Sequence, residues 1–336
     1  MIKGLAITPP ILGRISIGRV VEKNGKRLPE KDDQFTITTQ IQHKDGWLLH
    51  PFDEYLRQNV SSANGKLRSI PVRMLFDDPE LNLRAEYSLF DRSTGRPICV
   101  GNGEHCQRRT AEGVQQLACP SPSLCEFAPQ GHCKPYGRLT VQIEPQALEQ
   151  HNGLDQAAQP TLEQDELGVF VFRTTGFNSI RTLSARLSYL QAYSGGLLSC
   201  LPLQLKLRGK STTQSHRTPI FYVDLCIRDG LSMAQAVQLA RNTFEQRHAA
   251  GLKQNQLDFA AREGFNNALF ETNLEETPEV LEEFFNPQQD WYDSSLEPEE
   301  PQQVIPPTNS SLKTKLNRQL QHSSQQPTQP LQETRS

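Results

Sequence analysis

The chain has 336 residues, enough for one large domain or two smaller ones, and its 35 basic and 38 acidic residues give a formal net charge of −3. It has no run of about 18 apolar residues and no charged-then-apolar start, so a membrane span or a secretory signal is not expected. We therefore expect a cytoplasmic protein without membrane contact, in which the seven cysteines stay reduced.

The charges are unevenly distributed along the chain. Residues 1–262 carry 31 basic and 25 acidic side chains, whereas residues 263–300 carry 12 acidic and no basic ones. Residues 301–336 carry 4 basic and 1 acidic side chain. This asymmetry is typical of a mildly basic body with an acidic appendage, and it fits a solvated surface as well as it fits a binding role.

Residues 1–100 are predicted to be a β-rich N-terminal part. Apolar and polar residues alternate at 14–21, 32–42, 65–76 and 81–91, with turn-forming residues at 23–32 and 77–80. Gly95 is expected to form the bend of a further hairpin at 91–100. The predicted fold class is α+β: an antiparallel-sheet-rich domain with a cysteine-rich metal-binding insertion, C-terminal helices and a disordered tail.

Residues 101–138 are predicted to be an irregular, zinc-binding segment, because proline and glycine are frequent around its cysteines. The four cysteines are separated by 12, 5 and 7 residues, and His105 and His132 adjoin two of them; they are Cys106, Cys119, Cys125 and Cys133. Four soft ligands in a loop-rich stretch fit tetrahedral Zn²⁺, which would stabilise the local fold in place of a hydrophobic core. An iron–sulfur cluster uses the same thiolates and is the alternative, and unconnected reduced thiols are the third interpretation.

Such a closed site has no open coordination position, so we expect it to be structural rather than catalytic, even if a neighbouring histidine replaces one cysteine. Cys99, Cys200 and Cys226 lie in strand patterns and are predicted to be ordinary buried residues.

Residues 139–264 are predicted to be an α+β part of the same core. Strands are expected at 137–143 and 167–176, followed by a helix at 179–193 that Asn178 or Ser179 caps. A hairpin is expected at 201–208 and 221–228, followed by a helix that starts with a capping box of Ser232 and Gln235. The core face of the first helix is predicted to consist of Ile180, Leu183, Leu187 and Leu190.

Residues 265–292 form the acidic segment, and residues 293–336 are predicted to be a disordered tail rich in proline, glutamine and serine. A helix is expected from Thr277, with Pro278 in its first turn. Its apolar stripe is predicted to dock a partner or, with equal weight, to pack on the protein's own surface; the stripe is Val280, Leu281, Phe284 and Phe285.

The sequence contains no convincing catalytic motif, so we expect a protein that is not an enzyme. The stretch from Gly209 to Ser211 resembles a phosphate loop but lacks the required glycine, since position 204 is glutamine. Four carboxylates lack the lysine that a two-metal nuclease site needs at short spacing, and are read as solvated turn residues: Asp77, Asp78, Glu86 and Asp91. The candidate contacts to nucleic acid or a partner are basic: Arg173, Arg181, Lys210 and Arg217.

Three stretches together resemble a known family: "LGRISIGRVVEKNGKRLPEKDDQFTIT", "CPSPSLC" followed by "CKPYGRLTVQI", and "LGVFVFRTTGFNSIRTL". They are similar to the phage recombination directionality factors that partner large serine integrases, in which a CKP-containing cysteine segment precedes an RL-x-V strand. The resemblance covers residues 11–190 in patches, and the longer second half departs from it.

The resemblance implies a factor that binds an integrase on DNA and redirects it from integration to excision without catalysing strand exchange. We therefore predict a non-enzymatic, zinc-stabilised accessory protein of mobile-element recombination, with an integrase or recombinase as its partner and DNA as a second one. The alternative is a module that binds single-stranded DNA or a recombinase. Its stacking candidates are Phe170, Phe172 and Arg173, although a buried strand explains both phenylalanines better. A metal-dependent hydrolase is the third reading.

Overall fold

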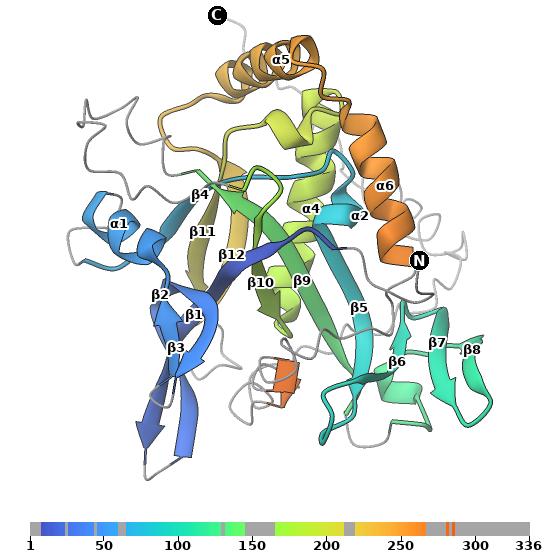
Figure 1. The fold of residues 1–336 in the computed structure, drawn as a ribbon. Helices are drawn as coiled ribbons and strands as arrows, with labels where there is room; N and C mark the ends of the chain where they lie inside the picture. The colour runs from blue at the N-terminus through green and yellow to red at the C-terminus, as the bar shows by residue number, and fades with distance from the viewer. Residues whose placement is uncertain are drawn as a thin grey trace, which may run out of the picture. The chain divides into compact units, whose positions relative to one another are not determined.

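The structure is a computed structural model that describes residues 8–23, 26–43, 46–59, 65–128, 132–144, 165–211, 219–266, 280–281 and 284–285. Within them the fold is α+β, as predicted, with a mostly antiparallel sheet and several helices (Figure 1). The main strand order is β3-β2-β1-β10-β9-β5-β6-β7-β8, and β4 joins β11 and β12 to β9. No helix in the described part of the chain is long and apolar enough to cross a bilayer.

The N-terminal strands β1 (Ile11–Lys23) and β2 (Lys26–His43) form a long antiparallel ribbon. Their pairing continues to Lys23 opposite Lys26, so the turn predicted at 23–32 is wrong in extent. Pro29 lies within β2, opposite Val20, because a two-stranded ribbon has edge positions where no ladder donor is needed. Strand β3 (Gly46–Leu49) and helix α1 (Pro51–Asn59) follow.

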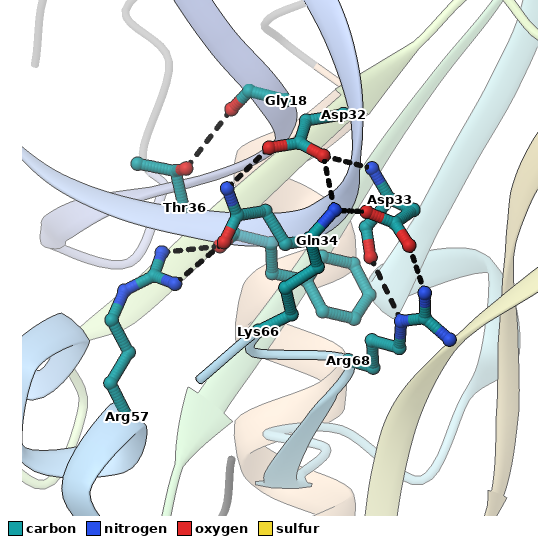
Figure 2. A network of polar contacts seen from close by, with 9 residues as sticks. Gly18, Asp32, Asp33, Gln34, Thr36, Arg57, Lys66 and Arg68 are labelled. Atoms are coloured by element: carbon teal, nitrogen blue, oxygen red, sulfur yellow. Dashed lines mark hydrogen bonds and ion pairs between the residues drawn. The ribbon is translucent and has the colours of Figure 1, made fainter. Parts of the chain in front are cut away.

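A polar network connects β2 to the segment before β4 and to α1 (Figure 2). Lys66 and Arg68 form ion pairs with Asp33, and Lys66 also reaches Asp32 at 3.0 Å. Arg57 of α1 donates from its Nη1 atom to Gln34 Oε1 at 2.8 Å. These bonds join segments that are far apart in sequence, so they fix where the ribbon leaves the sheet.

The centre of the sheet is formed by β10 (Val169–Thr174), which lies between β1 and β9 (Lys134–Ile143). Among the described strands, β1 and β10 form the one parallel pair. All six residues of β10 are buried, since both faces of a central strand are covered. Phe170 and Phe172 belong to the main apolar core and are not available for stacking on bases.

Strands β4 (Ser69–Arg73), β11 (Leu203–Lys210) and β12 (Ile220–Ile227) extend the core from β9, and β11 and β12 form the predicted hairpin. Helix α4 (Phe177–Ser194) packs chiefly on β12 and buries its predicted core face, Ile180, Leu183, Leu187 and Leu190.

The prediction that Asn178 or Ser179 caps α4 is wrong, because the N-cap residue is Gly176. Both side chains have tertiary partners instead. Lys210 Nζ donates to Asn178 Oδ1 at 2.6 Å, and the Val223 amide donates to Ser179 Oγ at 3.1 Å.

Two further helices follow the hairpin. Helix α5 (Met233–Ala249) begins with the predicted capping box, in which both reciprocal bonds are present. Helix α6 (Gln254–Asn266) is absent from the sequence prediction. It packs Phe265 edge-on against Phe76, and Gln254 Nε2 donates to the Leu75 carbonyl at 2.9 Å. The turn predicted at 77–80 is partly a short helix, α2 (Pro79–Asn82), which Asp78 caps.

The irregular structure predicted for residues 101–138 is also wrong in part. After β5 (Leu83–Phe90) and β6 (Pro97–Gly101), the chain forms a hairpin of β7 (His105–Thr110) and β8 (Gly113–Ala118). Five of the six β8 residues are exposed, so the sequence of this strand lacks the apolar alternation from which a strand is predicted. The remainder contains the short 3-10 turn η1 (Pro122–Leu124).

Candidate functional site

The strand register brings two cysteines onto one face of the sheet. In the β6–β7 ladder, Cys99 lies opposite Arg108 and Gly101 lies opposite Cys106. Directly opposed residues share a face, as do residues two apart in one strand. Cys99, Gly101, Cys106 and Arg108 therefore form one patch.

The other three cysteines approach this patch from the segment that follows β8. Cys119 lies just beyond β8 and donates its amide to the Glu104 carbonyl at 2.9 Å. Cys125 ends the turn η1, and Cys133 directly precedes β9. Together with Cys99 and Cys106 these residues line one cavity of about 10 Å³, space for a single water-sized particle.

The four cysteines that the sequence analysis groups all line this cavity, together with a fifth, Cys99, that it left out of the group. Cys99 is buried as predicted, but it faces the other cysteines rather than an apolar core. The sequence hint that Cys99 joins the cluster was its distance of seven positions from Cys106. Two strands joined by a short turn can place residues at this distance side by side. His105 and His132 are exposed and do not line the cavity.

Because Gly101 has no side chain, it leaves room for the side chains of Cys106 and Cys119. A Cβ atom at this position would lie 2.7 Å from Cys106 Cβ and 2.9 Å from Cys119 Sγ, closer than real contacts allow. The φ angle of Gly101 is not in the left-handed region, so the requirement for glycine comes from the close approach and not from backbone strain.

Burial and neighbouring thiols raise the pKa of two cysteines of the cluster, Cys106 and Cys133. Burial and then the charges of neighbouring thiolates, Cys99 first, raise the pKa of Cys133 to about 12. Burial and then a hydrogen bond with Cys99 raise the pKa of Cys106 to about 11. Cys106 and Cys133 therefore keep their protons at neutral pH unless a cation compensates the thiolate charge.

Arg108 supplies one nearby cation. Its guanidinium carbon lies 3.9 Å from the ring centroid of Phe127. Burial alone lowers the pKa of Arg108, but its hydrogen bond with Cys99 and the charges of the thiolates outweigh that effect and raise the pKa. The guanidinium therefore faces the thiols while the Phe127 ring covers it.

The donor set is suited to a soft metal ion, because clustered thiolates prefer zinc or iron–sulfur centres. No three histidine, cysteine or carboxylate side chains in the described ranges have the arrangement that could hold an ion. Coordination by these residues therefore requires the thiols to move towards one another.

The four predicted basic contacts do not form one surface. Arg173 is buried in β10, opposite Arg138 of β9, whereas Arg181 is exposed on α4. Lys210 contacts Asn178, one helical turn from Arg181, so these two lie close together. Arg217 lies outside the described residues.

The sequence analysis missed two further arginines, which share one carboxylate. Arg186 of α4 donates from Nε to Asp224 Oδ1 at 2.9 Å, and Arg208 of β11 donates from Nε to Asp224 Oδ2 at 3.3 Å. Their side chains are 49% and 45% exposed, while that of Asp224 is 6% exposed. One buried carboxylate thus orients two guanidinium groups that remain open to solvent.

The predicted partner-docking stripe packs on the chain itself. Val280 and Phe284 are buried in a small cluster with Phe90, and the Phe284 ring lies 4.8 Å from that of Phe90. Leu281 and Phe285 are half-buried. Thr277, Pro278 and the tail at 293–336 lie outside the described residues. Partner docking by this stripe stays a prediction, and it requires the segment to leave Phe90.

Each carboxylate considered for a nuclease site has a nearby structural partner. Asp77 Oδ1 accepts from the Ser199 amide at 2.8 Å, and Asp78 caps α2 and pairs with Arg262. Asp91 accepts from Ser93 and Thr94 in its turn. Its pKa is lowered to about 2, chiefly by the Ser93 hydroxyl. The remaining carboxylate, Glu86, lies 4.0 Å from Arg84.

The described residues thus define a sheet-based α+β protein with a thiol-lined cavity at one end of the sheet. The sequence model of the family Gp3-like, "Recombination directionality factor-like", matches residues 12–228. The match covers more than half of the chain, which therefore belongs to this family, as the resemblance predicted. It also includes the hairpin at 201–228, where the sequence analysis expected a departure from the family, so that expectation is wrong. The family points to a role in phage recombination, with partners in the recombination machinery. No curated protein matches the sequence, and no solved structure matches the fold.

Proposed function

We propose that this chain is an accessory factor that binds a serine integrase of a mobile element and redirects it from integration to excision. The observation that carries the proposal is the family match over residues 12–228, which spans the sheet, the cysteine segment, α4 and the β11–β12 hairpin. The sheet, α4 and the β11–β12 hairpin share one hydrophobic core with β4 and β9, and the cysteine segment continues the same sheet through β7 and β8, so these parts act as one body rather than as separate modules.

The factor acts by binding and not by catalysis. The polar contacts of Asp77, Asp78 and Asp91 serve the fold, which leaves these carboxylates poorly placed for a reacting group. Purified protein should therefore hydrolyse neither nucleic acids nor nucleotides in the presence of magnesium, manganese or zinc. Turnover that disappears in an Asp77→Ala or Asp91→Ala variant would favour the hydrolase reading instead.

We also propose that zinc stabilises the end of the sheet formed by β6, β7 and β8. The support is the convergence of five thiols on one small cavity, in a region where β8 is nearly all exposed and contributes little apolar core. Bound Zn²⁺ would supply the positive charge that the thiolates need and no reaction step. Elemental analysis should give about one zinc per chain. Stoichiometric iron would replace zinc by a cluster.

The surface proposed to meet DNA or the recombinase consists of Arg181, Arg186, Arg208 and Lys210. Arg186 and Arg208 are held in place by Asp224, so little side-chain entropy is lost when they bind an acidic surface or phosphates. A double Arg186→Gln, Arg208→Gln variant should bind the integrase–DNA complex more weakly. Its salt dependence should also be shallower if the contacts are to phosphates.

The direct test uses the serine integrase encoded nearest to this chain. Integrase alone should recombine the two integration sites, and addition of this protein should inhibit that reaction and start recombination of the two hybrid excision sites. The protein alone should recombine neither pair. An integrase whose direction does not change, although the two proteins bind each other, would refute the directional role but not the interaction.

A further inference from the structure

Exposed tyrosines adjoin two arginines where α4 lies against the β11–β12 hairpin. We propose that this surface binds an acidic segment of a partner protein, whose carboxylates contact Arg186 and Arg208 and whose apolar side chains cover Tyr189 and Tyr193. Within the proposed function, on which this inference rests, that partner is the recombinase. The arginines then serve the recognition of a protein, and DNA is not what they contact.

Tyr189 and Tyr193 are open to solvent on α4. They are 73% and 61% exposed. Four positions separate them, so the two rings lie one helical turn apart on the same side of the helix. A single exposed apolar side chain is ordinary on a protein surface, but two neighbouring rings form a patch. Each ring can bury about 150–250 Å² on a partner, which makes tyrosine a strong anchor in an interface.

The same side of α4 contacts the hairpin at two points. Arg186, three positions before Tyr189, donates from Nε to Asp224 Oδ1 of β12 at 2.9 Å. About two helical turns earlier, Asn178 Oδ1 accepts from Lys210 Nζ of β11 at 2.6 Å. Residues three or four positions apart share one side of a helix, so these contacts and the tyrosines belong to one flank of α4. This flank and the hairpin therefore form one continuous surface.

Positive charge dominates this surface. Arg186 and Arg208 are 49% and 45% exposed, whereas the carboxylate that both contact, Asp224, is 6% exposed. No residue of α4 is acidic. Asp229, beyond the end of β12, is 70% exposed, but both of its oxygens accept from Lys206 Nζ at 2.7 Å. The surface therefore complements a negatively charged partner.

Asp224 prepares the two guanidinium groups for a second carboxylate. Arg186 and Arg208 each donate their Nε–H to it, at 2.9 and 3.3 Å, and Arg186 adds a longer contact from Nη2 at 3.4 Å. The other terminal N–H groups of each guanidinium remain for a carboxylate of the partner, which they can bind in pairs. Because the side chains are already held in place, little rotamer entropy is lost on binding.

The number of cations favours a protein partner over DNA. Tight binding of duplex DNA commonly uses about six to ten phosphate contacts. This surface offers Arg186, Arg208 and Lys210, with Arg181 as a further cation on α4, and Asp224 offsets part of their charge. Tyrosine and arginine are, by contrast, the residue types that are enriched at the energetic centre of protein interfaces.

The test measures the affinity of the full-length protein for the serine integrase encoded nearest to it, without DNA, by titration calorimetry. The double variant Tyr189→Ala, Tyr193→Ala should raise Kd about tenfold or more. The double variant Arg186→Gln, Arg208→Gln should do the same. It also leaves Asp224 buried without its cations, so the tyrosine variant, which removes only exposed rings, is the decisive one.

Two matched controls lie on α6. Phe259→Ala removes a ring that is 64% exposed. Arg262→Gln removes an arginine whose side chain is 54% exposed and which pairs with Asp78. Both variants change the same kinds of residue outside the proposed surface, so they should leave Kd within about twofold of the wild-type value.

An integrase affinity that the tyrosine variant leaves unchanged would overturn the proposed surface. The opposite selectivity would overturn it as well: both double variants lose affinity for a DNA duplex that carries one recombination site, but bind the integrase as the wild type does. Failure of the wild-type protein to bind the integrase would refute the proposed function itself, and this failure is recognised before any variant is compared.

Discussion

Replacement of Gly101 by alanine tests whether the thiols pack against Gly101 as closely as they do in the structure. The new methyl group would lie 2.7 Å from Cys106 Cβ and 2.9 Å from both Cys119 Sγ and the His105 carbonyl oxygen. One of these neighbours is backbone in the β6–β7 turn region, so a side-chain rotation cannot relieve every contact. The strands or the loop at 119 must move.

Two opposing effects set the magnitude of the change in the free energy of unfolding. Overpacking a tight site costs about 1–3 kcal/mol, while alanine in place of glycine in a strand otherwise gains about 0.5–1 kcal/mol. We therefore expect Gly101→Ala to lower the free energy of unfolding by about 1–2 kcal/mol. Urea unfolding followed by circular dichroism measures it, with and without zinc.

Gly209→Ala is the matched control. Gly209 also lies in a strand, but the nearest atom to its added Cβ is a ring carbon of Phe221 at 3.2 Å, which can give way. Because no backbone clash opposes the gain from alanine in a strand, this variant should leave the free energy of unfolding unchanged or raise it by up to about 1 kcal/mol. A Gly101→Ala protein as stable as wild type, or more stable, would refute the close packing of the thiols, because the sign of the effect depends on the clash.

Three other perturbations test the packing around the core. Asp53→Ala removes the buried acceptor of a β2 amide at 2.8 Å, and should lower the free energy of unfolding by about 2–4 kcal/mol; a loss below about 1 kcal/mol in urea titrations would contradict this. Burial is the main cause that raises the pKa of both Asp77 and Asp258 above the ordinary value of 3.8. Their contribution to the stability of the protein is therefore present below pH 3.8 and is lost as the pH rises through the pKa of the folded state. Asp258→Asn should therefore flatten the fall in unfolding midpoint over that window, and an unchanged slope would argue against it. Phe284→Ala should weaken the packing of its segment on Phe90 by up to about 3–5 kcal/mol and make that segment sensitive to protease. Phe285→Ala removes a half-buried ring and should have a smaller effect. Equal cleavage of both variants would show that the contact with Phe90 does not hold the segment.

Much of the fold follows from local sequence patterns. The structure contains the predicted alternation of buried and exposed residues in β11 and β12 and the predicted apolar face of α4. A period of two or of 3.6 residues can be read from the chain itself. The capping box of Ser232 and Gln235 is equally local, since both partners lie within one helical turn. The family resemblance likewise rests on residues that can be read in order.

The sequence failed where distant residues compete for a side chain. Asn178 and Ser179 have the chemistry of helix caps, but Lys210 and a β12 amide take their oxygen atoms. Arg173 was a contact candidate by charge, yet its position in β10 buries it between β1 and β9. In both cases a partner far away in sequence outweighs the local preference.

For the candidate site, the sequence by itself determined that several thiols gather in one stretch with few other means of stabilisation. Only the tertiary structure decided that Cys99 joins them, because the register of β6 against β7 sets which side chains share a face. The same register places Gly101 between Cys106 and Cys119, where a larger residue does not fit. The seven-residue distance between Cys99 and Cys106 is compatible with a hairpin but does not set its register, so it does not say which side chains share a face.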